Sequence, residues 1–379
     1  MKISRVLTKT IISKLKASNK GIIIYGARQV GKTTLVNDVI KSLGLKTLAI
    51  NADQSKYLDV FSGRDLTRMK DFVKGYELLF IDEAQRIPEI GINLKILLDN
   101  IKNLKVIVTG SSSLDLASKI SEPLTGRVWT YKLYPISFHE LALFKNKFEL
   151  DEWLEERLIF GAYPEIFNMS GETTKREHLQ NLSDAYLYKD LLELGDIRNS
   201  NKIRDLLKLL AFQIGSEVSI SELGTSLGMG KDTVSRYIDF LEKSYVIFRL
   251  GGFSRNLRKE VTKMDKIFFY DLGIRNVLID NLKPLKDRND TGQLWENFLI
   301  VERMKYLAYT QRRVSSYFWR LYTGAELDYV EDTGGNLRGY EFKLGRKVNK
   351  APNGWRATYA DASFNCVNRN SYLGFITRV

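Results

Sequence analysis

The sequence predicts an α/β protein that begins with a parallel sheet, continues with a helical region and ends with a second α/β unit. Three observations lead to this prediction. Short apolar runs alternate with helical patterns at the start, a helix-turn-helix pattern lies in the middle, and period-two alternation returns near the end. The predicted units are residues 1–148, 149–285 and 286–379.

Four apolar runs in the first unit are typical of short buried strands: Gly21–Tyr25, Leu45–Ile50, Leu78–Ile81 and Lys105–Thr109. Helical patterns at Lys32–Leu43 and Ile92–Ile101 lie between them. Parallel strands need such crossover connections, so the alternation favours a parallel sheet with helices on its faces.

A glycine-rich loop joins the first strand to the first helix. Its residues are Gly26, Ala27, Arg28, Gln29, Val30, Gly31, Lys32 and Thr33, with Thr34 continuing into the helix. They fit the G-x-x-x-x-G-K-[ST] pattern, in which backbone N–H groups and the helix dipole hold phosphates. We expect Lys32 to reach the β- and γ-phosphates and Thr33 to bind Mg²⁺. The predicted ligands are therefore ATP and Mg²⁺.

Two carboxylates follow the buried strand Leu78–Ile81. Asp82 and Glu83 emerge at its carboxyl end, the edge where ligands of open α/β sheets collect. We expect Asp82 to hold Mg²⁺ and Glu83 to orient or deprotonate the attacking water, so that Lys32 and Glu83 both act in catalysis. The loop and the two carboxylates together predict a hydrolysis site.

These motifs carry a family resemblance. Gly-Ala-Arg-Gln-Val-Gly-Lys-Thr-Thr, Phe-Ile-Asp-Glu-Ala-Gln, Thr-Gly-Ser-Ser-Ser, and Leu-Thr-Gly-Arg with the later Leu-Tyr-Pro-Ile-Ser-Phe resemble prokaryotic AAA-type ATPases with a C-terminal domain of formerly unassigned function. The resemblance covers nearly the whole chain. It implies a P-loop AAA-type core, then a helical and winged-helix region, and a C-terminal fold similar to PD-(D/E)XK nucleases.

The same resemblance suggests a γ-phosphate sensor after the strand that ends at Thr109. Ser111 is the candidate, and Ser112 is an open alternative. Arg127, on a turn before an apolar segment, is a candidate arginine finger acting in cis or from a neighbouring subunit. A trans role would require a homo-oligomer, and a solvated surface arginine is the plain alternative.

The middle unit contains the helix-turn-helix pattern. Ser219 can cap the first helix, Gly228 lies in the turn, and Asp232 or Thr233 is expected to start the second helix. The polar residues of this second helix that are free to meet a DNA groove are Lys231, Ser235 and Arg236.

Two wing strands are expected at Tyr245–Leu250 and Ile267–Tyr270. The segment between them carries four cations suited to phosphate contacts, namely Arg255, Arg258, Lys259 and Lys263. DNA is therefore one predicted partner, and docking to another protein is the alternative role of such a module.

The last unit carries acidic and lysine positions similar to those of the PD-(D/E)XK fold. Glu341 and Lys343 share one face of a strand. If Asp328 ends the neighbouring strand, Asp328 and Glu341 could hold a second divalent ion. Glu296 would add a carboxylate from the preceding helix. The acidic motif has Glu326-Leu327-Asp328 in place of Pro-Asp, so a retained fold without cleavage activity is the alternative.

Composition narrows the chemistry. The single cysteine, Cys366, excludes an internal disulfide and favours a reducing cytoplasm. Two histidines make a zinc site or a His-dependent triad improbable, so any metal should sit on carboxylates. We expect no signal peptide and no membrane span. The formal charge of +13 favours an anionic partner, although a merely soluble basic surface explains it equally well.

Three hypotheses follow from the sequence. The first is an ATPase that couples turnover to DNA binding or processing. The second is a signalling switch whose ATP state controls protein docking, with an inactive nuclease-like domain. The third is a metal-dependent nuclease for which ATP is regulatory.

Overall fold

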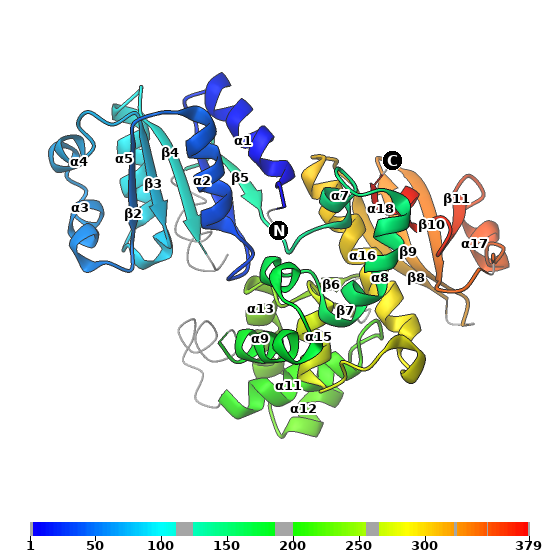
Figure 1. Cartoon of the computed structure of the whole chain (residues 1–379). Helices are drawn as coiled ribbons and strands as arrows, with labels where there is room; N and C mark the ends of the chain where they lie inside the picture. The colour runs from blue at the N-terminus through cyan, green and yellow to red at the C-terminus, as the bar shows by residue number, and fades with distance from the viewer. Residues whose placement is uncertain are drawn as a thin grey trace.

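The structure is a computed structural model that describes residues 3–110, 124–185, 200–254, 265–321, 324–346 and 348–377. The parallel sheet and its helices lie on one side of the molecule and the C-terminal sheet on the other (Figure 1). The middle helices lie between and below these two parts in the same view.

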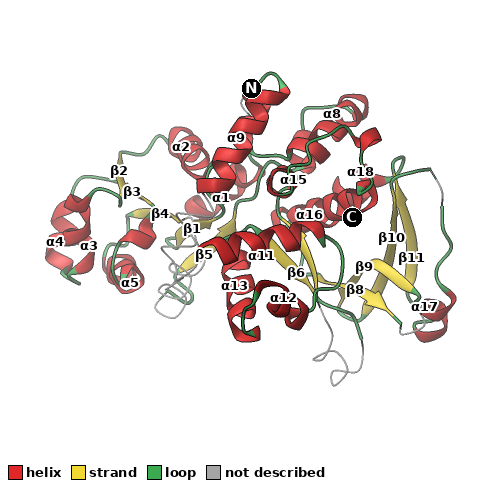
Figure 2. Cartoon of the chain, turned by 90° about the horizontal axis from the view of Figure 1, so that it is seen from below, coloured by secondary structure: helices red, strands yellow, loops and turns green. Residues whose placement is uncertain are grey.

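The first part is a five-stranded parallel sheet with the order β2-β3-β4-β1-β5. Its strands are β1 (Gly21–Tyr25), β2 (Thr47–Asn51), β3 (Leu78–Asp82), β4 (Lys105–Gly110) and β5 (Val128–Lys132). Its helices are α1 (Val6–Ala17), α2 (Lys32–Leu43), α3 (Leu58–Ser62), α4 (Leu66–Phe72) and α5 (Ile90–Asn100). Figure 2 shows α1 and α2 on one face of the sheet and α5 on the other. The predicted parallel sheet is confirmed.

Strand β4 occupies the middle of this sheet. It pairs with β1 on one side, where Ile22 faces Ile107, and with β3 on the other, where Ile81 faces Val108. The carboxyl ends of β1, β4 and β3 therefore lie side by side at one edge of the sheet.

The middle region is helical and ends in a hairpin. Its helices are α7 (Phe138–Leu141), α8 (Lys147–Phe160), α9 (Glu172–Ala185), α11 (Ser200–Phe212), α12 (Ile220–Leu227), α13 (Lys231–Lys243) and α15 (Leu272–Leu278). The hairpin strands are β6 (Ile247–Leu250) and β7 (Lys266–Phe269), and they pair antiparallel.

The helix-turn-helix forms where the sequence predicts it, with one shift. The Ser219 hydroxyl accepts a hydrogen bond from the backbone N–H of Glu222, and Gly228 ends α12 with φ of 59°. Helix α13 begins at Lys231 rather than at Asp232 or Thr233, because Gly230 takes the extended N-cap conformation. The four predicted wing cations lie outside the described residues.

The C-terminal part is a mixed sheet with the order β11-β10-β9-β8. Its strands are β8 (Ser315–Arg320), β9 (Glu326–Thr333), β10 (Asn336–Lys343) and β11 (Ser363–Asn368), and its helices are α16 (Thr291–Tyr309), α17 (Asn353–Thr358) and α18 (Tyr372–Thr377). Strands β8, β9 and β10 pair antiparallel, while β11 runs parallel to β10. Short 3₁₀ helices are η1 (Ser55–Tyr57), η2 (Ala84–Arg86), η3 (Pro164–Asn168) and η5 (Leu285–Asp287).

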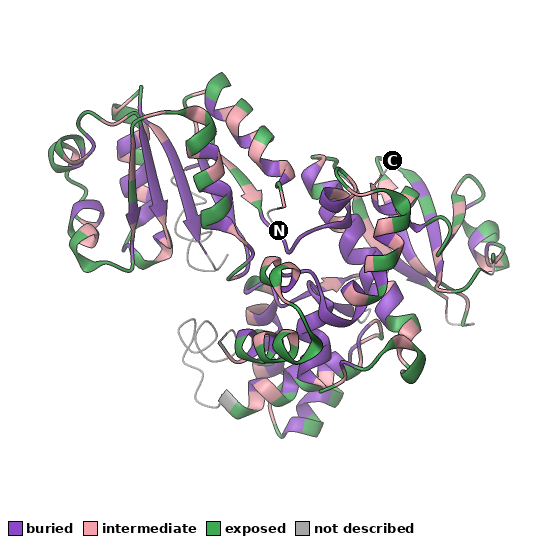
Figure 3. Ribbon diagram, viewed as in Figure 1, coloured by how far each residue is buried: buried purple, intermediate pink, exposed green. Residues whose placement is uncertain are grey.

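Buried side chains run through all three parts (Figure 3). One continuous hydrophobic cluster extends from Leu7 to Ile376, and a smaller one surrounds Trp319 and Trp355. Helix α7, which follows the parallel sheet in sequence, packs against α16 and α18. In the ranges that the structure covers, no helix is long and apolar enough to span a membrane.

Candidate functional site

The glycine-rich loop connects β1 to α2 through tight backbone geometry. Gln29 and Gly31 have φ of 57° and 93°, the left-handed region that glycine adopts without strain. Gly26 has no room for a side chain, because a Cβ atom there would lie 2.3 Å from the carbonyl oxygen of Leu133. The loop therefore needs glycine at both ends of its pattern.

Lys32 opens helix α2 and points back into the loop. Its side chain is buried, and its Nζ donates hydrogen bonds to the carbonyl oxygens of Gly26 and Ala27, each at 2.9 Å. The ammonium group thus lies inside the curve of the loop, where phosphate oxygens would bind.

Asp82, at the end of β3, receives donors from three different elements. Thr33 Oγ1 donates to its Oδ2 at 2.8 Å, and the Glu83 backbone N–H donates to its Oδ1 at 3.2 Å. The Thr109 hydroxyl, at the end of β4, also donates to Oδ1. The structure therefore brings together the loop threonine and the strand carboxylate, which are distant in sequence.

Thr109 is a site residue that sequence reasoning did not identify. Its contact with Asp82 depends on β4 lying directly beside β3. The only signal in the sequence is a hydroxyl at the end of an apolar strand. The sensor candidates Ser111 and Ser112, two and three residues further on, lie outside the described residues.

Glu83 is held in the left-handed conformation with φ of 52°. Its Oε2 accepts a hydrogen bond of 2.5 Å from Gln85 Nε2. The side chain is half-buried, next to Asp82 at the edge where Lys32 also lies.

A second group of charged residues lies at the C-terminal sheet. Asp328 Oδ2 accepts a hydrogen bond of 2.6 Å from the Phe342 backbone N–H, and Lys343 Nζ lies 2.8 Å from Glu341 Oε1. Lys266, from β7, lies 3.2 Å from Glu296 Oε1 on α16. The structure thus collects the four predicted side chains and adds Lys266, which no sequence pattern placed there.

Burial shapes the protonation of this group. Burial raises the pKa of Glu296 to about 7, while Lys266 opposes the rise and Asp328 adds to it. Burial also raises the pKa of Asp328 to about 6, with a contribution from the charge of Glu341. These two carboxyl groups and Glu341 therefore lie close enough to interact electrostatically.

The polar side of α13 faces solvent. Lys231 and Arg236 are exposed, and Ser235 is half-buried. The opposite face of the helix is buried in the core through Val234, Tyr237, Ile238 and Leu241. Helix α13 thus has one buried apolar face and one polar face toward solvent.

Comparison with known families separates the three parts of the chain. Residues 18–142 match the model of a family described as an AAA domain. The first part of the chain is thus similar to AAA-type P-loop ATPase domains. Residues 151–285 and 291–369 match two models that are each described as a domain of unknown function, DUF8612 and DUF4143. We refer to the part similar to AAA domains as the ATPase domain, while the winged helix and the nuclease-like fold stay predictions.

Two relatives align over more than three quarters of the chain. An uncharacterized protein of Methanocaldococcus jannaschii is 28% identical over 318 residues, which cover 79% of this chain and 69% of the relative. An uncharacterized protein of Mycobacterium tuberculosis is 29% identical over 329 residues, which cover 85% and 70%. Among solved structures, the Walker-type ATPase of Pyrococcus abyssi aligns with a TM-score of 0.45 at 14% identity, covering 72% of this chain and 94% of that one.

Arg127 lies at the edge of the parallel sheet opposite to the phosphate loop. Its carbonyl oxygen accepts a hydrogen bond from the backbone N–H of Gly21, at the amino end of β1, whereas the phosphate loop follows the carboxyl end. The length of β1 separates them, roughly 15 Å. Its guanidinium instead donates to Asp99 at 2.7 Å. In this structure Arg127 therefore lies away from the phosphate loop of its own chain, and its role as an arginine finger stays a prediction.

The residues of the ATPase domain suit Mg²⁺ bound together with a nucleotide. Mg²⁺ is usually held by one or two protein oxygens, phosphate oxygens and water, and Thr33 and Asp82 supply one hydroxyl and one carboxylate. Elsewhere in the described ranges, as in this domain, no group of three or more His, Cys, Asp and Glu side chains is arranged to hold a metal ion. A second divalent ion at Asp328 and Glu341 is therefore not supported.

Proposed function

We propose that the chain binds and hydrolyses Mg-ATP at the Gly26–Thr34 loop. Lys32 neutralises charge on the β- and γ-phosphates, Thr33 and Asp82 hold Mg²⁺, and Glu83 orients the attacking water. The observation that carries this proposal is the Asp82 carboxylate, fixed at once by donors from the loop, from β4 and from its own backbone neighbour. Such fixed orientation is what phosphoryl transfer requires of a protein.

We further propose that ATP turnover is coupled to DNA. Support comes from the exposed cations Lys231 and Arg236 on the second helix of a helix-turn-helix pair, and from the net charge of +13. The hairpin β6–β7 follows these helices in sequence, which is the order expected of a winged helix.

A specific observation favours the second candidate, an ATP-dependent switch with an inactive nuclease-like domain. In the C-terminal group, two carboxylates are already paired with lysines, Glu296 with Lys266 and Glu341 with Lys343. Each ammonium group supplies the charge compensation that a metal ion would otherwise give, so nuclease chemistry is the less supported activity.

The test measures steady-state ATP hydrolysis by the full chain in Mg²⁺, alone and with single-stranded, duplex and branched DNA. We expect DNA to raise turnover and Lys32→Ala to abolish it in every case. Lys41→Ala, an exposed lysine in the last turn of the same helix, is the matched control. DNA binding without any change in turnover would refute the coupling, and a lack of DNA affinity at physiological ionic strength would favour the switch.

The DNA surface has its own test. Lys231→Ala and Arg236→Ala should each weaken duplex binding and reduce the salt slope by about one unit. Lys95→Ala, exposed on α5 in the ATPase domain, should leave both unchanged. Equal effects of all three substitutions would indicate non-specific attraction to a basic protein.

Cleavage is assayed in the same reactions with Mg²⁺ or Mn²⁺. If the C-terminal domain is a nuclease, cleavage appears and is lost in Asp328→Ala and Glu341→Ala. Intact substrate after prolonged incubation with both ions would leave this domain a binding role only.

A further inference from the structure

Arg5, just before α1, joins the phosphate loop to the C-terminal part of the molecule. Its guanidinium is buried, with Nε donating to Glu140 Oε1 at 2.9 Å and Nη1 donating to the Val30 carbonyl oxygen at 2.8 Å. Nη2 donates to the Tyr134 carbonyl oxygen at 2.6 Å and to the Tyr309 hydroxyl at 3.2 Å. One side chain therefore contacts the loop, the segment after β5, and the last residue of α16.

The charge of Arg5 is stable in this position. Burial alone lowers the pKa of Arg5, but the Glu140 carboxylate and Tyr309 raise it by more than burial lowers it. The pKa of Arg5 is therefore raised overall, and the guanidinium stays protonated. A buried charge with satisfied donors has a fixed geometry, because moving it leaves unpaired polar groups behind. Arg5 thus holds its partners at defined distances from one another.

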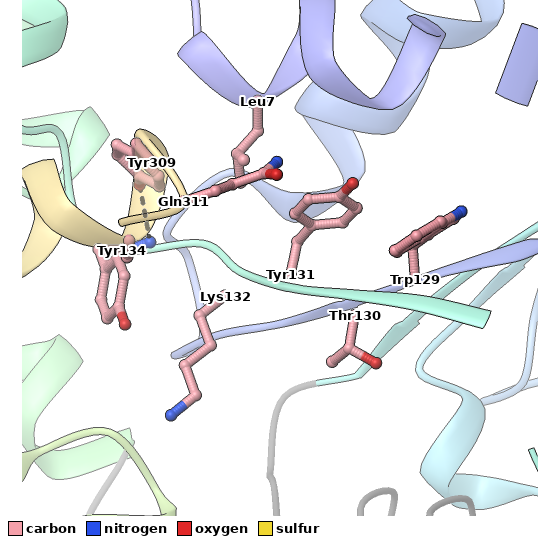
Figure 4. Close-up of a pocket in the computed structure, with 9 residues that line it drawn as sticks. Leu7, Trp129, Thr130, Tyr131, Lys132, Tyr134, Tyr309 and Gln311 are labelled. Atoms are coloured by element: carbon pink, nitrogen blue, oxygen red, sulfur yellow. Dashed lines mark hydrogen bonds between the residues drawn. The ribbon is translucent and has the colours of Figure 1, made fainter. Parts of the chain in front are cut away.

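The partner in the C-terminal part is equally fixed. The Tyr309 hydroxyl accepts a second hydrogen bond, of 3.1 Å, from the Tyr134 backbone N–H, as the dashed line in Figure 4 shows. Tyr309 ends α16, the helix whose first half carries Glu296. The helix spans roughly 20 Å between these two residues and is rigid on that scale.

The loop is held from a second direction by the same segment. The Leu133 backbone N–H donates to the Tyr25 carbonyl oxygen at 2.7 Å, directly before Gly26. The Leu133–Tyr134 backbone and Arg5 therefore contact both ends of the phosphate loop, at Gly26 and at Val30.

We propose that Arg5 is a positioning residue for the nucleotide site, and that its anchor is Tyr309 of α16. Through the Val30 carbonyl, Arg5 sets the backbone conformation that aims the loop N–H groups at phosphate. Because the same guanidinium is fastened to Tyr309, this conformation depends on how α16 is docked. The inference rests on the proposed function, since it requires nucleotide to bind at this loop.

The experiment measures the Kd of Mg-ADP by titration calorimetry on the full chain, together with KM and kcat for ATP. Arg5→Lys keeps the charge but has only three N–H donors on one nitrogen, so it cannot keep all four hydrogen bonds that Arg5 makes. Tyr309→Phe keeps the ring and removes only the hydroxyl. We expect each variant to raise Kd and KM by about tenfold. The double variant should be little worse than either single one, because both act on the same contact.

Tyr372→Phe is the matched control. It also removes a buried tyrosine hydroxyl that hydrogen-bonds across the molecule, to Asp151 at 2.8 Å, but on α18 and without contact to Arg5. Its Kd should stay within twofold of the wild-type value, even where its Tm falls as far as that of Tyr309→Phe. A merely structural role of Tyr309 predicts equal Kd values in these two variants at equal Tm.

The outcomes separate this inference from the proposed function. If Lys32→Ala weakens ADP binding while Tyr309→Phe matches Tyr372→Phe, the anchor on α16 is refuted and the nucleotide site stands. If the two substitutions raise Kd independently, so that their effects multiply in the double variant, Arg5 and Tyr309 do not act through the same contact, and the inference is likewise refuted. If Lys32→Ala leaves nucleotide binding and hydrolysis unchanged, the proposed function itself is wrong.

Discussion

Thr109→Val tests the arrangement of the hydrolysis site most directly, because it changes one hydroxyl and almost no volume. In the structure that hydroxyl donates to Asp82 Oδ1, while Thr33 donates to Oδ2. A hydrogen bond to a charged acceptor contributes about 1.5–3 kcal/mol. If that energy acts in the transition state, kcat/KM for ATP should fall roughly 10- to 150-fold.

The loss should have a particular form. Asp82 keeps its donors from Thr33 and Glu83, so the variant leaves no buried acceptor without a partner. We therefore expect little change in Tm and a higher Mg²⁺ concentration for half-maximal activity. A Mg²⁺ titration of the steady-state ATPase rate, with thermal unfolding in parallel, measures both quantities.

Thr130→Val, at an exposed position of β5 in the same sheet, is the control and should leave kcat/KM and the Mg²⁺ dependence unchanged. A double-mutant cycle with Asp82→Asn completes the test. If Thr109 acts through Asp82, the Thr109→Val substitution should hardly change kcat/KM in a protein that already carries Asp82→Asn. A Thr109→Val enzyme within twofold of wild type would refute the role of β4 in holding the carboxylate.

Three further predictions concern other residues. Glu83→Gln should lower the single-turnover hydrolysis rate by about 10²- to 10⁴-fold and leave Mg-ATP binding nearly unchanged; an equal loss in both would assign Glu83 to binding. If Arg127 acts in trans, Arg127→Ala should reduce ATPase activity only at protein concentrations at which the wild-type specific activity has risen. A loss of activity in dilute, monomeric protein would contradict a role in trans. Burial raises the pKa of Asp290, but two arginines lower it more, to about 2. Asp290→Asn should therefore destabilise the chain at pH 7 and progressively less from about pH 4 to 2, which urea unfolding at pH 7 and 3 measures.

The parallel sheet and the phosphate loop could be predicted because their signals are local. Four strands and the motif between β1 and α2 are each encoded within about ten neighbouring residues, where apolar periodicity and glycine spacing are decisive. The strand predicted at Leu45–Ile50 forms at Thr47–Asn51, an ordinary uncertainty at an element's ends.

The contacts of Thr109, Arg5 and Lys266 could not be predicted in the same way. Thr109 meets Asp82 only because β4 lies between β1 and β3, an order that no local pattern states. Arg5 has its partners at four separate places in the chain, and Lys266 on β7 meets Glu296 on α16. Each of these contacts exists only after the long-range topology has formed.

Many buried contacts cross the boundaries between the predicted units, so these boundaries are poor places to divide the protein. The Phe138 backbone N–H donates to Glu302 at 2.6 Å, and the Tyr134 backbone N–H donates to the Tyr309 hydroxyl at 3.1 Å. A cut at residue 148 or 285 would leave one partner of such pairs buried and uncompensated, a loss of several kcal/mol for a charged group. An isolated C-terminal fragment without nuclease activity would therefore say little about the intact domain. Each hypothesis has to be tested by point substitution in the full chain, where the ATPase domain and α16 keep their contact through Arg5.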